Sequence, residues 1–433
     1  MGGAQGTARS AARAASTERT RAAILSAARG LFVEQGYRAT SLRDIAASAG
    51  ISVAGLLRHF PTKDVLLIAV LDAIERGEAP ELIDRLAQDR SGGLHYATIA
   101  RWNATVPGYA ALYAALTGEA STSTHPAHAS MRSRYGSLRH RVACELREAS
   151  RRGAVDAARD PDAEAVRLIA GWDGLQLLQQ YLPRRVDVVE RLEAHQVLLA
   201  APPGSAARRG DRPTDPAPLP REPLRAEPAS SGGYRPGRER RSRILADAMA
   251  LFARDGYGDT SLREVADRVG VAKTTLLHHY PSKEALLGAV LVERDRAVQA
   301  AAAADDADRA AEAVRAIPRG AAANSVSEPG LIQVHAVLSC EAVPIGHPAH
   351  EYFVHRFESG LDYFRDLFAG ARSDGELGVG RDPEHEAIWL VALWEGLQYQ
   401  WLYDRGAVDV GAQLDAHLAD VVPRPVDAFP ALD

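Results

Sequence analysis

The chain has 433 residues, a formal net charge of −5, 46% hydrophobic residues and 25% charged residues. This composition is normal for a globular protein and excludes wholesale disorder, and the length predicts about two to four domains. No apolar run is long enough to span a membrane, and the weak acidity excludes a uniformly basic coat protein without pointing to any partner.

The N-terminal segment 1–17 combines arginine, alanine and serine and contains no acidic residue. The composition superficially fits a transit peptide, but the segment lacks the apolar region of a secretion signal. It also lacks the myristoylation pattern, because Gly6 stands where Ser or Thr is needed. We expect residues 1–17 to form a disordered basic arm.

The chain contains two copies of one unit. When 220 is added to the residue numbers, 17 of the 37 positions from 31 to 67 are identical to positions 251 to 287. The match resumes when 222 is added, and a His-Pro-Ala-His segment at 125–128 then repeats at 347–350. The segments Trp-Asp-Gly-Leu-Gln at 172–176 and Trp-Glu-Gly-Leu-Gln at 394–398 match with the same offset. We infer two tandem copies of a unit of roughly 200 residues.

Residues 201–237 separate the two copies. This segment holds nine of the 24 prolines and almost no large apolar residue, so it cannot bury a core. We expect a linker that lets the two copies pack in any orientation.

Both copies predict helices throughout. Apolar residues recur with the period of an amphipathic helix over 24–32 and again over 244–252. Gly36 and Gly256 follow these stretches, where glycine commonly ends a helix. Neither copy shows the alternating pattern of a β-strand, so the predicted fold class is all-α.

Each copy then shows the pattern of a helix-turn-helix. Ser41 and Ser261 stand where a hydroxyl can cap the free amide groups of a second helix. That helix ends at Gly50 or Gly270, and a third short helix follows over 52–60 or 272–280. In a helix-turn-helix, the second helix of the pair enters the major groove of DNA.

The residues of this region are similar to those of the TetR family of bacterial transcriptional regulators. The shared pattern is Gly-Tyr-x-x-Thr-Ser-Leu-Arg-[Asp/Glu]-[Ile/Val]-Ala, then Gly-[Ile/Val], then Leu-Leu-x-His-[Phe/Tyr]-Pro-x-Lys. It covers residues 18–77 and 238–297. The resemblance implies two helix-turn-helix domains (18–78 and 238–298), each followed by a helical ligand-binding and dimerisation domain (79–200 and 299–425).

The distribution of charge agrees with this interpretation. Residues 1–65 contain nine basic and four acidic residues, and residues 234–285 contain ten and seven. The three lysines of the chain, Lys63, Lys273 and Lys283, all lie in these two segments. The overall acidity therefore does not argue against binding to phosphates.

The resemblance assigns base and phosphate contacts to the third helix of each copy and its flanks. The expected DNA-binding residues are Ser41, Ser52, Val53, Gly55, Leu57, Arg58, His59 and Lys63, and in the second copy Ser261, Lys273, Thr274, Thr275, Leu277, His278, His279 and Lys283. Lys63 and Lys283 are expected on backbone phosphates. The family often has Tyr at the positions of Leu57 and Leu277.

Simpler roles remain open for some of these residues. Packing accounts for His59 and His279 as well as a phosphate contact does, and Arg58 could be a solvated surface charge. The third helix of the first copy is also poor in hydrogen-bonding groups, with Val53 and Ala54 at the positions of Lys273 and Thr274. We therefore expect direct reading of bases mainly from the second copy.

Aromatic residues late in each copy are candidates for lining an effector pocket, although core packing is the more frequent role for any one of them. These residues are Trp172, Tyr181, Trp394, Tyr399, Trp401 and Tyr403. The second copy is richer in them and is the preferred ligand-binding half.

No metal, cofactor or catalytic site is expected. His125 and His128, like His347 and His350, could join Glu119 or Glu341 around a metal, but a His-Pro segment is more often a helix start. The two cysteines, Cys144 and Cys340, lack the spacing of a zinc site. No nucleophile elbow, phosphate-binding loop or zinc-protease motif is present, so an enzyme is not expected.

We therefore expect a ligand-responsive transcriptional repressor of the bacterial cytoplasm, with double-stranded operator DNA and a small-molecule effector as partners and no membrane. One chain would supply both DNA-reading domains as an internal pseudo-dimer, and a homodimer of chains stays possible. In one alternative, only the second copy reads DNA and the first is a partner module. In another, the protein is a small-molecule-binding protein or enzyme with degenerate DNA-reading domains.

Overall fold

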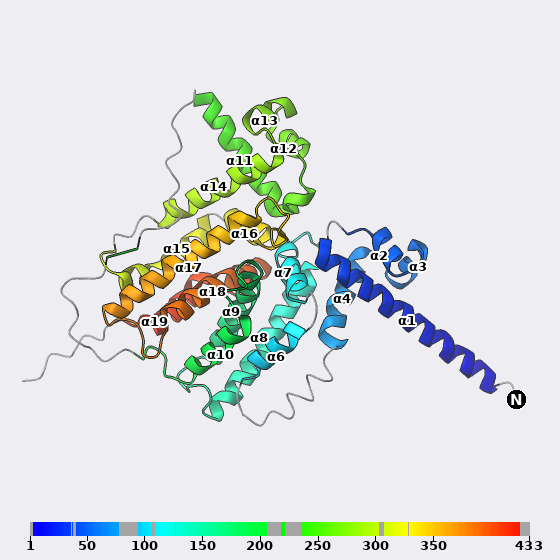
Figure 1. The fold of residues 1–433 in the computed structure, drawn as a ribbon, viewed down its shortest axis with the longest axis horizontal. Coiled ribbons are helices and arrows are strands. Elements are labelled where there is room, and N and C mark those ends of the chain that lie inside the picture. The colour runs from blue at the N-terminus through cyan, green and yellow to red at the C-terminus, as the bar shows by residue number, and fades with distance from the viewer. Residues whose placement is uncertain are drawn as a thin grey trace, which may run out of the picture.

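The computed structural model describes residues 3–35, 37, 40–77, 94–105, 109–125, 127–205, 218–220, 235–302, 307–327 and 329–424. Within these ranges the structure is built from helices and contains no β-strand, which confirms the predicted all-α class (Figure 1). None of the described helices is long and apolar enough to cross a membrane.

Each copy consists of a small head and a larger body. Head one comprises α1 (Gly3–Gln35), α2 (Leu42–Ser48), α3 (Val53–His59) and α4 (Lys63–Gly77). Body one comprises α6 (Tyr96–Thr105), α7 (Tyr109–Glu119), α8 (His128–Arg151), α9 (Pro161–Tyr181) and α10 (Val188–Leu199). Head two comprises α11 (Arg235–Asp259), α12 (Leu262–Val269), α13 (Lys273–His279) and α14 (Lys283–Ala302). Body two comprises α15 (Ala310–Ser327), α16 (Pro329–Glu341), α17 (His350–Ser373), α18 (Pro383–Tyr403) and α19 (Val410–Val421).

The repeat in the sequence is a repeat in the structure. Helices α8, α9 and α10 have the same bounds as α17, α18 and α19 once 222 is added to their residue numbers. Asp160 and Asp382 cap α9 and α18 at equivalent positions, each followed by a proline in the first turn. The same local signals therefore start the same helices in both copies. Of the two glycines predicted to end a helix, Gly256 has a non-helical φ of 80° at a kink in α11, and Gly36 lies outside the described residues.

The N-terminal segment and the linker differ from expectation. Helix α1 begins at Gly3, so residues 3–17 continue the first helix instead of forming a disordered arm. Alanine and arginine are strong helix formers, and they dominate this segment. Most of the predicted linker lies outside the described residues. Its first residues are held against body two, because the amide of Gly204 donates to Asp420 Oδ1 at 2.8 Å.

The two bodies pack against each other through α9 and α18, which approach at two equivalent glycines. A Cβ atom added at Gly174 would lie 1.9 Å from the carbonyl oxygen of Ala392. A Cβ atom added at Gly396 would lie 1.9 Å from the carbonyl oxygen of Ala170. Gly174 and Ala170 become Gly396 and Ala392 on adding 222, so a pseudo-two-fold axis relates the two contacts.

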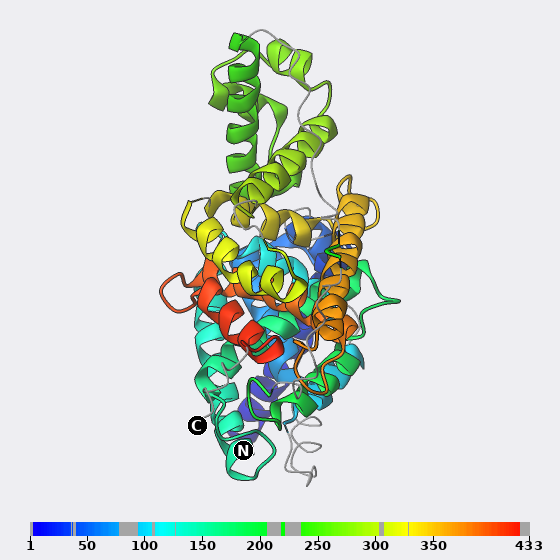
Figure 2. The ribbon, with the colours of Figure 1, turned by 90° about the vertical axis from the view of Figure 1, so that its left-hand side faces the viewer.

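A second crossing lies on the same axis, where α7 of body one meets α16 of body two. Gly118 faces Cys340 there, and these two residues also occupy equivalent positions of the repeat. Helices α8 and α17 flank α9 and α18 within their own bodies. The heads project from this paired core, and Figure 2 shows head two standing clear of the bodies.

We predict that Gly174→Ala and Gly396→Ala each lower the free energy of unfolding by about 1–3 kcal/mol, because the added methyl group must push the two helices apart. Urea unfolding measures the change. Gly136→Ala on α8 is the matched control, since nothing lies within 4 Å of an added Cβ there. The control should be neutral or stabilising by up to about 1 kcal/mol, as expected for glycine in a helix. Equal effects at the three sites would contradict the close approach.

Candidate nucleic-acid interface

The helix-turn-helix of each head is set by short-range signals. Ser41 and Ser261 form capping boxes with Asp44 and Glu264, in which each side chain accepts from the other residue's backbone amide. Gly50 and Gly270 follow with φ of 68° and 76°, a left-handed conformation that favours glycine. The next helix, α3 or α13, starts three residues later and agrees with the predicted ranges 52–60 and 272–280.

One face of each recognition helix is buried in its head. Leu56 and Leu276 have no exposed surface, and Phe60 and Tyr280 close the helices as nearly buried C-caps. All four residues belong to the hydrophobic core. The buried face fixes the rotation of the helix, so the opposite face is presented outward.

In each head, one arginine that sequence reasoning missed contacts the aromatic residue at the end of the recognition helix. The guanidinium of Arg21 lies 4.6 Å from the ring centroid of Phe60. Arg241 donates from Nε to the hydroxyl of Tyr280 at 3.2 Å. The number of Arg241 is that of Arg21 plus 220, and this equivalence within the repeat was the available signal.

The outward faces of the two recognition helices differ in chemistry. In α3 the exposed positions include Val53 and Leu57, with 36% and 39% of their surface accessible. In α13 the exposed positions include Lys273, Thr274 and His278, which carry hydrogen-bond donors. At these positions head two therefore exposes hydrogen-bond donors, and head one exposes apolar side chains.

The remaining predicted DNA contacts lie on the same faces or at their edges. Exposed residues are Ser41, Ser52, Arg58 and Ser261, and half-buried residues are Gly55, His59, Thr275, Leu277 and His279. The hydroxyls of Ser41, Ser52 and Ser261 accept from the backbone amides of Asp44, Gly55 and Glu264, so their first role is to cap helices. Burial lowers the pKa of His279, and its ring packs edge-on to that of His278.

Lys63 and Lys283 have internal partners in the structure. Lys63 donates from Nζ to the carbonyl oxygen of Thr40 at 2.8 Å and lies over the ring of Tyr37 at 4.3 Å. Lys283 repeats the arrangement with the carbonyl oxygen of Gly258 at 3.1 Å. Each ammonium thus binds the main chain just before the second helix of its head. Burial lowers the pKa of Lys283.

The joint between head two and body two is polar. The carboxylate of Glu341, at the end of α16, accepts from the amides of Tyr257 and Gly258 at 2.6 and 2.5 Å. His347 packs edge-on to the ring of Tyr257, with 5.1 Å between ring centroids. In head one, His125 packs in the same way on Tyr37 at 5.3 Å. The position of each head is therefore tied to the end of α7 or α16.

The His-Pro-Ala-His segments serve this joint and the start of the next helix. His125 and His347 accept from the amides two residues on through Nδ1, at 3.2 and 3.1 Å. His128 and His350 begin α8 and α17 and contact the carbonyl oxygens of Ala120 and Ala342 through Nδ1. Among the described residues, no group of three or more His, Cys, Asp or Glu residues could hold a metal ion.

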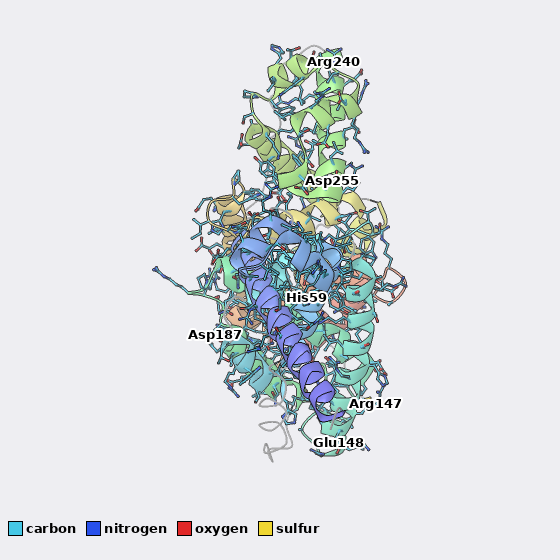
Figure 3. All side chains as sticks on the ribbon, turned by 90° about the vertical axis from the view of Figure 1, so that its right-hand side faces the viewer. His59, Arg147, Glu148, Asp187, Arg240 and Asp255 are labelled. Carbon is cyan, nitrogen blue, oxygen red and sulfur yellow. The ribbon has the colours of Figure 1, made fainter. Side chains whose placement is uncertain are left out.

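The two recognition helices lie in separate heads, α13 at the top and α3 at the right of Figure 1. In Figure 1, α3 and α13 both lie at the outer side of their heads, away from α10 and α19. Figure 3 looks from the side of head one, with His59 in that head and Arg240 at the far end of head two. Each head thus presents one recognition helix outward.

Comparison with known proteins agrees with this geometry. Residues 24–70 and 244–290 each match the N-terminal domain of bacterial regulatory proteins of the tetR family. The chain is 31% identical over 187 residues to the HTH-type transcriptional repressor KstR of Mycobacterium tuberculosis, covering 41% of this chain and 78% of that repressor. The chain belongs to the TetR family. This membership confirms the resemblance seen in the sequence.

Other HTH-type transcriptional regulators match over shorter stretches. An HTH-type transcriptional repressor of Mycobacterium tuberculosis is 46% identical over 82 residues, covering 17% of this chain and 44% of the relative. The regulator RutR of Escherichia coli is 48% identical over 48 residues, covering 11% of this chain and 23% of that protein. The chain thus spans less than half the length of these two relatives.

Of the six aromatic candidates for an effector pocket, the three tyrosines lie near the α7–α16 crossing, where Tyr181 and Tyr399 both contact Ser339. Tyr181 leaves body one and enters body two, where its hydroxyl donates to the carbonyl oxygen of Ser339 at 2.5 Å. Tyr403 enters body one in return and donates to the carbonyl oxygen of Thr117 at 2.7 Å. Tyr399 is buried beside Cys340, with 3.3 Å between hydroxyl and Sγ.

The other three candidates are tryptophans. Trp401 is nearly buried beneath the guanidinium of Arg405, and Trp172 and Trp394 pack half-buried against the core. A surface hollow of about 500 Å³ lies between α6 and α10, and none of the six residues lines it. The hollow is bordered instead by residues such as Leu94, Arg101 and Val197.

Sequence reasoning missed a buried acidic residue in each body, at equivalent positions of the Trp-Asp-Gly and Trp-Glu-Gly segments. Asp173 accepts from the hydroxyl of Tyr135 at 2.7 Å, and burial raises its pKa to about 7. Glu395 lies 2.9 Å from Nε2 of His335, whose pKa burial lowers to about 4. The acid following each tryptophan was the available signal. Each body thus holds a polar cluster inside an apolar helical core.

The raised pKa of Asp173 predicts a pH dependence. Its ordinary pKa is 3.8 and its folded pKa is about 7, so the folded state holds the proton more tightly. Stability should therefore fall as the pH rises from about 4 to about 7. Asp173→Asn keeps an acceptor for Tyr135 but has no proton to lose.

The test is urea unfolding of both proteins across this pH range. The advantage of Asp173→Asn over the wild type should grow by up to about 4 kcal/mol between pH 4 and pH 7. Asp415→Asn, at an exposed position of α19, should show no such trend. A constant difference between Asp173→Asn and wild type would contradict the assignment.

Proposed function

We propose that this protein is a ligand-responsive transcriptional repressor in which one chain supplies both DNA-reading heads as a pseudo-dimer. The single observation that carries the proposal is the pairing of the two bodies within one chain through α9 and α18. The two heads that carry α3 and α13 both lie at the end of the paired bodies away from α10 and α19 (Figure 1). Family members with one head per chain need two chains to present two recognition helices on a two-fold operator.

The proposed operator has two unequal half-sites. Head two would read bases through Lys273 and Thr274, with Thr275, Leu277, His278 and His279 beside them on α13. Head one would use Val53 and Leu57 on α3 for apolar contact, for which the thymine methyl group is the suitable partner. Arg58 and the flanking residues of both helices would contact phosphates.

A small-molecule effector would act through the bodies. The polar clusters around Asp173 and Glu395 support this part of the proposal, because polar groups in an apolar helical core are where an effector finds specific hydrogen bonds. The effector would favour one separation of the heads over another. Operator affinity would then fall by the ratio of its affinities for the two states.

The stoichiometry of binding tests the proposal. An operator obtained by selection from random DNA is titrated with protein well above the dissociation constant, and the complex is weighed by native mass spectrometry. We expect one chain per operator at saturation. A complex that always contains two chains would refute the single-chain arrangement. Absence of any selected sequence would refute DNA recognition altogether.

We predict that Thr274→Val alters sequence preference in one half-site and leaves the other unchanged, because the hydroxyl that can bond a base edge is lost from α13 alone. A good base contact contributes about 1–3 kcal/mol of discrimination. Ala54→Thr, at the equivalent position of α3, is the matching change in head one and should alter the opposite half-site. The measurement is selection from random DNA followed by sequencing. Identical profiles for wild type and Thr274→Val would exclude Thr274 as a base contact.

A further inference from the structure

The two bodies share a fold but differ in the side chains at their mutual interface. We infer that body one and body two are complementary only to each other, so that neither can pair with a second copy of itself. This inference rests on the proposed pseudo-dimer and adds a rule of partner choice to it. Three sites of the interface carry it, and each compares residues at equivalent positions of the repeat.

The first site is the crossing of α7 and α16 on the pseudo-two-fold axis. A Cβ atom added at Gly118 would lie 2.3 Å from the Cβ atom of Cys340, so the glycine leaves the space that the cysteine fills. Because the two positions are equivalent, pairing of two bodies two would set Cys340 against Cys340 at this spacing. Pairing of two bodies one would leave two glycines and a gap. Only the mixed pair fills the site without overlap.

The second site surrounds Trp389 on α18. Its indole stacks on the ring of His195 from body one, with 3.5 Å between ring centroids and planes within 5° of parallel. A Cβ atom added at Gly171 would lie 2.7 Å from Cζ2 of this indole. The residue of body two equivalent to Gly171 is Leu393. In a pair made of two copies of body two, Trp389 would therefore overlap with the side chain of Leu393.

The third site excludes the opposite self-pairing. Arg167 of α9, the equivalent of Trp389, donates from Nη1 to Gln413 Oε1 of body two at 3.0 Å. The residue of body one equivalent to Gln413 is Arg191. Two bodies one would therefore place Arg167 against Arg191 in a region where both side chains are largely buried. Like charges that are shielded from water repel strongly.

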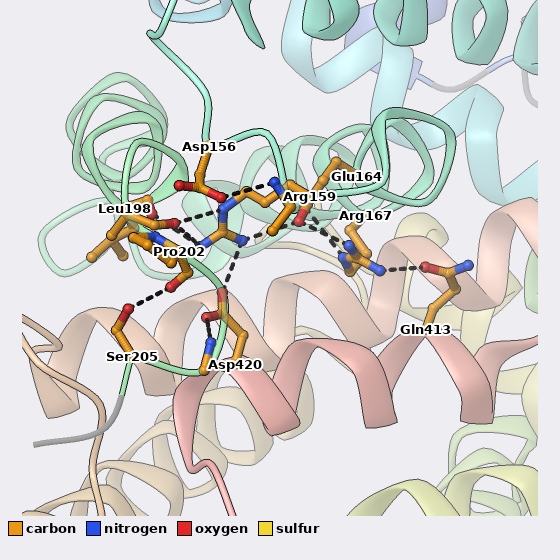
Figure 4. Close-up of polar contacts among 12 residues, drawn as sticks. Asp156, Arg159, Glu164, Arg167, Leu198, Pro202, Ser205, Gln413 and Asp420 are labelled. Carbon is orange, nitrogen blue, oxygen red and sulfur yellow. Dashed lines mark hydrogen bonds and ion pairs between the residues drawn. The ribbon is translucent and has the colours of Figure 1, made fainter.

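A shared carboxylate adds to this asymmetry, and Figure 4 shows its contact with Arg159 as well as the Arg167–Gln413 contact. Arg159 and Arg381 are equivalent residues, and both bind Asp420 Oδ2, at 2.9 and 2.6 Å. The residue of body one equivalent to Asp420 is Leu198. A pair of bodies one would lack this carboxylate, and a pair of bodies two would bring two of them into one buried site. The mixed pair supplies one acid between two arginines.

Exchange of partners tests the rule. A protease site is inserted between residues 206 and 217 of the full chain, and the folded protein is cut there. The cut protein is diluted until the halves separate, reconcentrated and weighed by native mass spectrometry. We expect complexes of one N-terminal and one C-terminal half only. Homotypic pairs in amounts comparable to the mixed pair would overturn the inference.

Two substitutions at the contact between Arg167 and Gln413 test the third site directly. Gln413→Arg places in body two the residue that body one has there, and should raise the dissociation constant of the cut halves by about tenfold or more. Adding Arg167→Gln should bring the constant back to within about threefold of wild type, because the opposed charges are removed. Asp415→Arg, exposed on the same helix, should change it little.

Each outcome of these substitutions either supports or overturns the inference. An unchanged constant for Gln413→Arg overturns the inference. A Gln413→Arg protein that fails to fold, with helix content restored by Arg167→Gln, supports it. DNA binding is measured separately on the uncut protein. If no DNA sequence were selected while the halves still paired only with each other, the proposed function would fail and the pairing rule would stand.

Discussion

The contact between α9 and α18 is the constraint on which the rest of the structure depends. At Gly174 and Gly396 the two helices approach so closely that main-chain atoms of one touch main-chain atoms of the other. Main-chain atoms cannot change rotamer to relieve a mismatch, so the spacing and crossing of the bodies are set there. The heads inherit this geometry because each is joined to the end of a helix in its own body.

Each body also contributes one tyrosine to the interior of the other body. Tyr181 completes the core of body two and Tyr403 completes the core of body one, each through a hydrogen bond to a carbonyl oxygen near the α7–α16 crossing. Glu341, which holds head two, directly follows Cys340 at that crossing. A change of conformation in one body would therefore be transmitted to the other body and to the heads through residues in direct contact.

Local features of this fold could be predicted and long-range ones could not. The recognition helices and their capping serines follow from periodicity and turn chemistry, and the repeat itself revealed the two copies. Periodicity shows which face of α9 is buried but not what covers it, so the entry of Tyr181 into the other body was not foreseen. The phosphate contacts expected for Lys63 and Lys283 came from the family resemblance. The carbonyl groups that these lysines bind in the structure were not foreseen, because they belong to residues more than 20 positions earlier.

Covalent connection of the two bodies changes how the paired form depends on the amount of protein. A regulator assembled from two separate chains loses its paired form on dilution, because association competes with the entropy of free chains. Here the partner is supplied at an effective concentration set by the connecting segment, whatever the total amount of protein. With the proposed stoichiometry of one chain per operator, occupancy of the operator would follow the first power of protein concentration, and dilution would not dissociate the paired bodies.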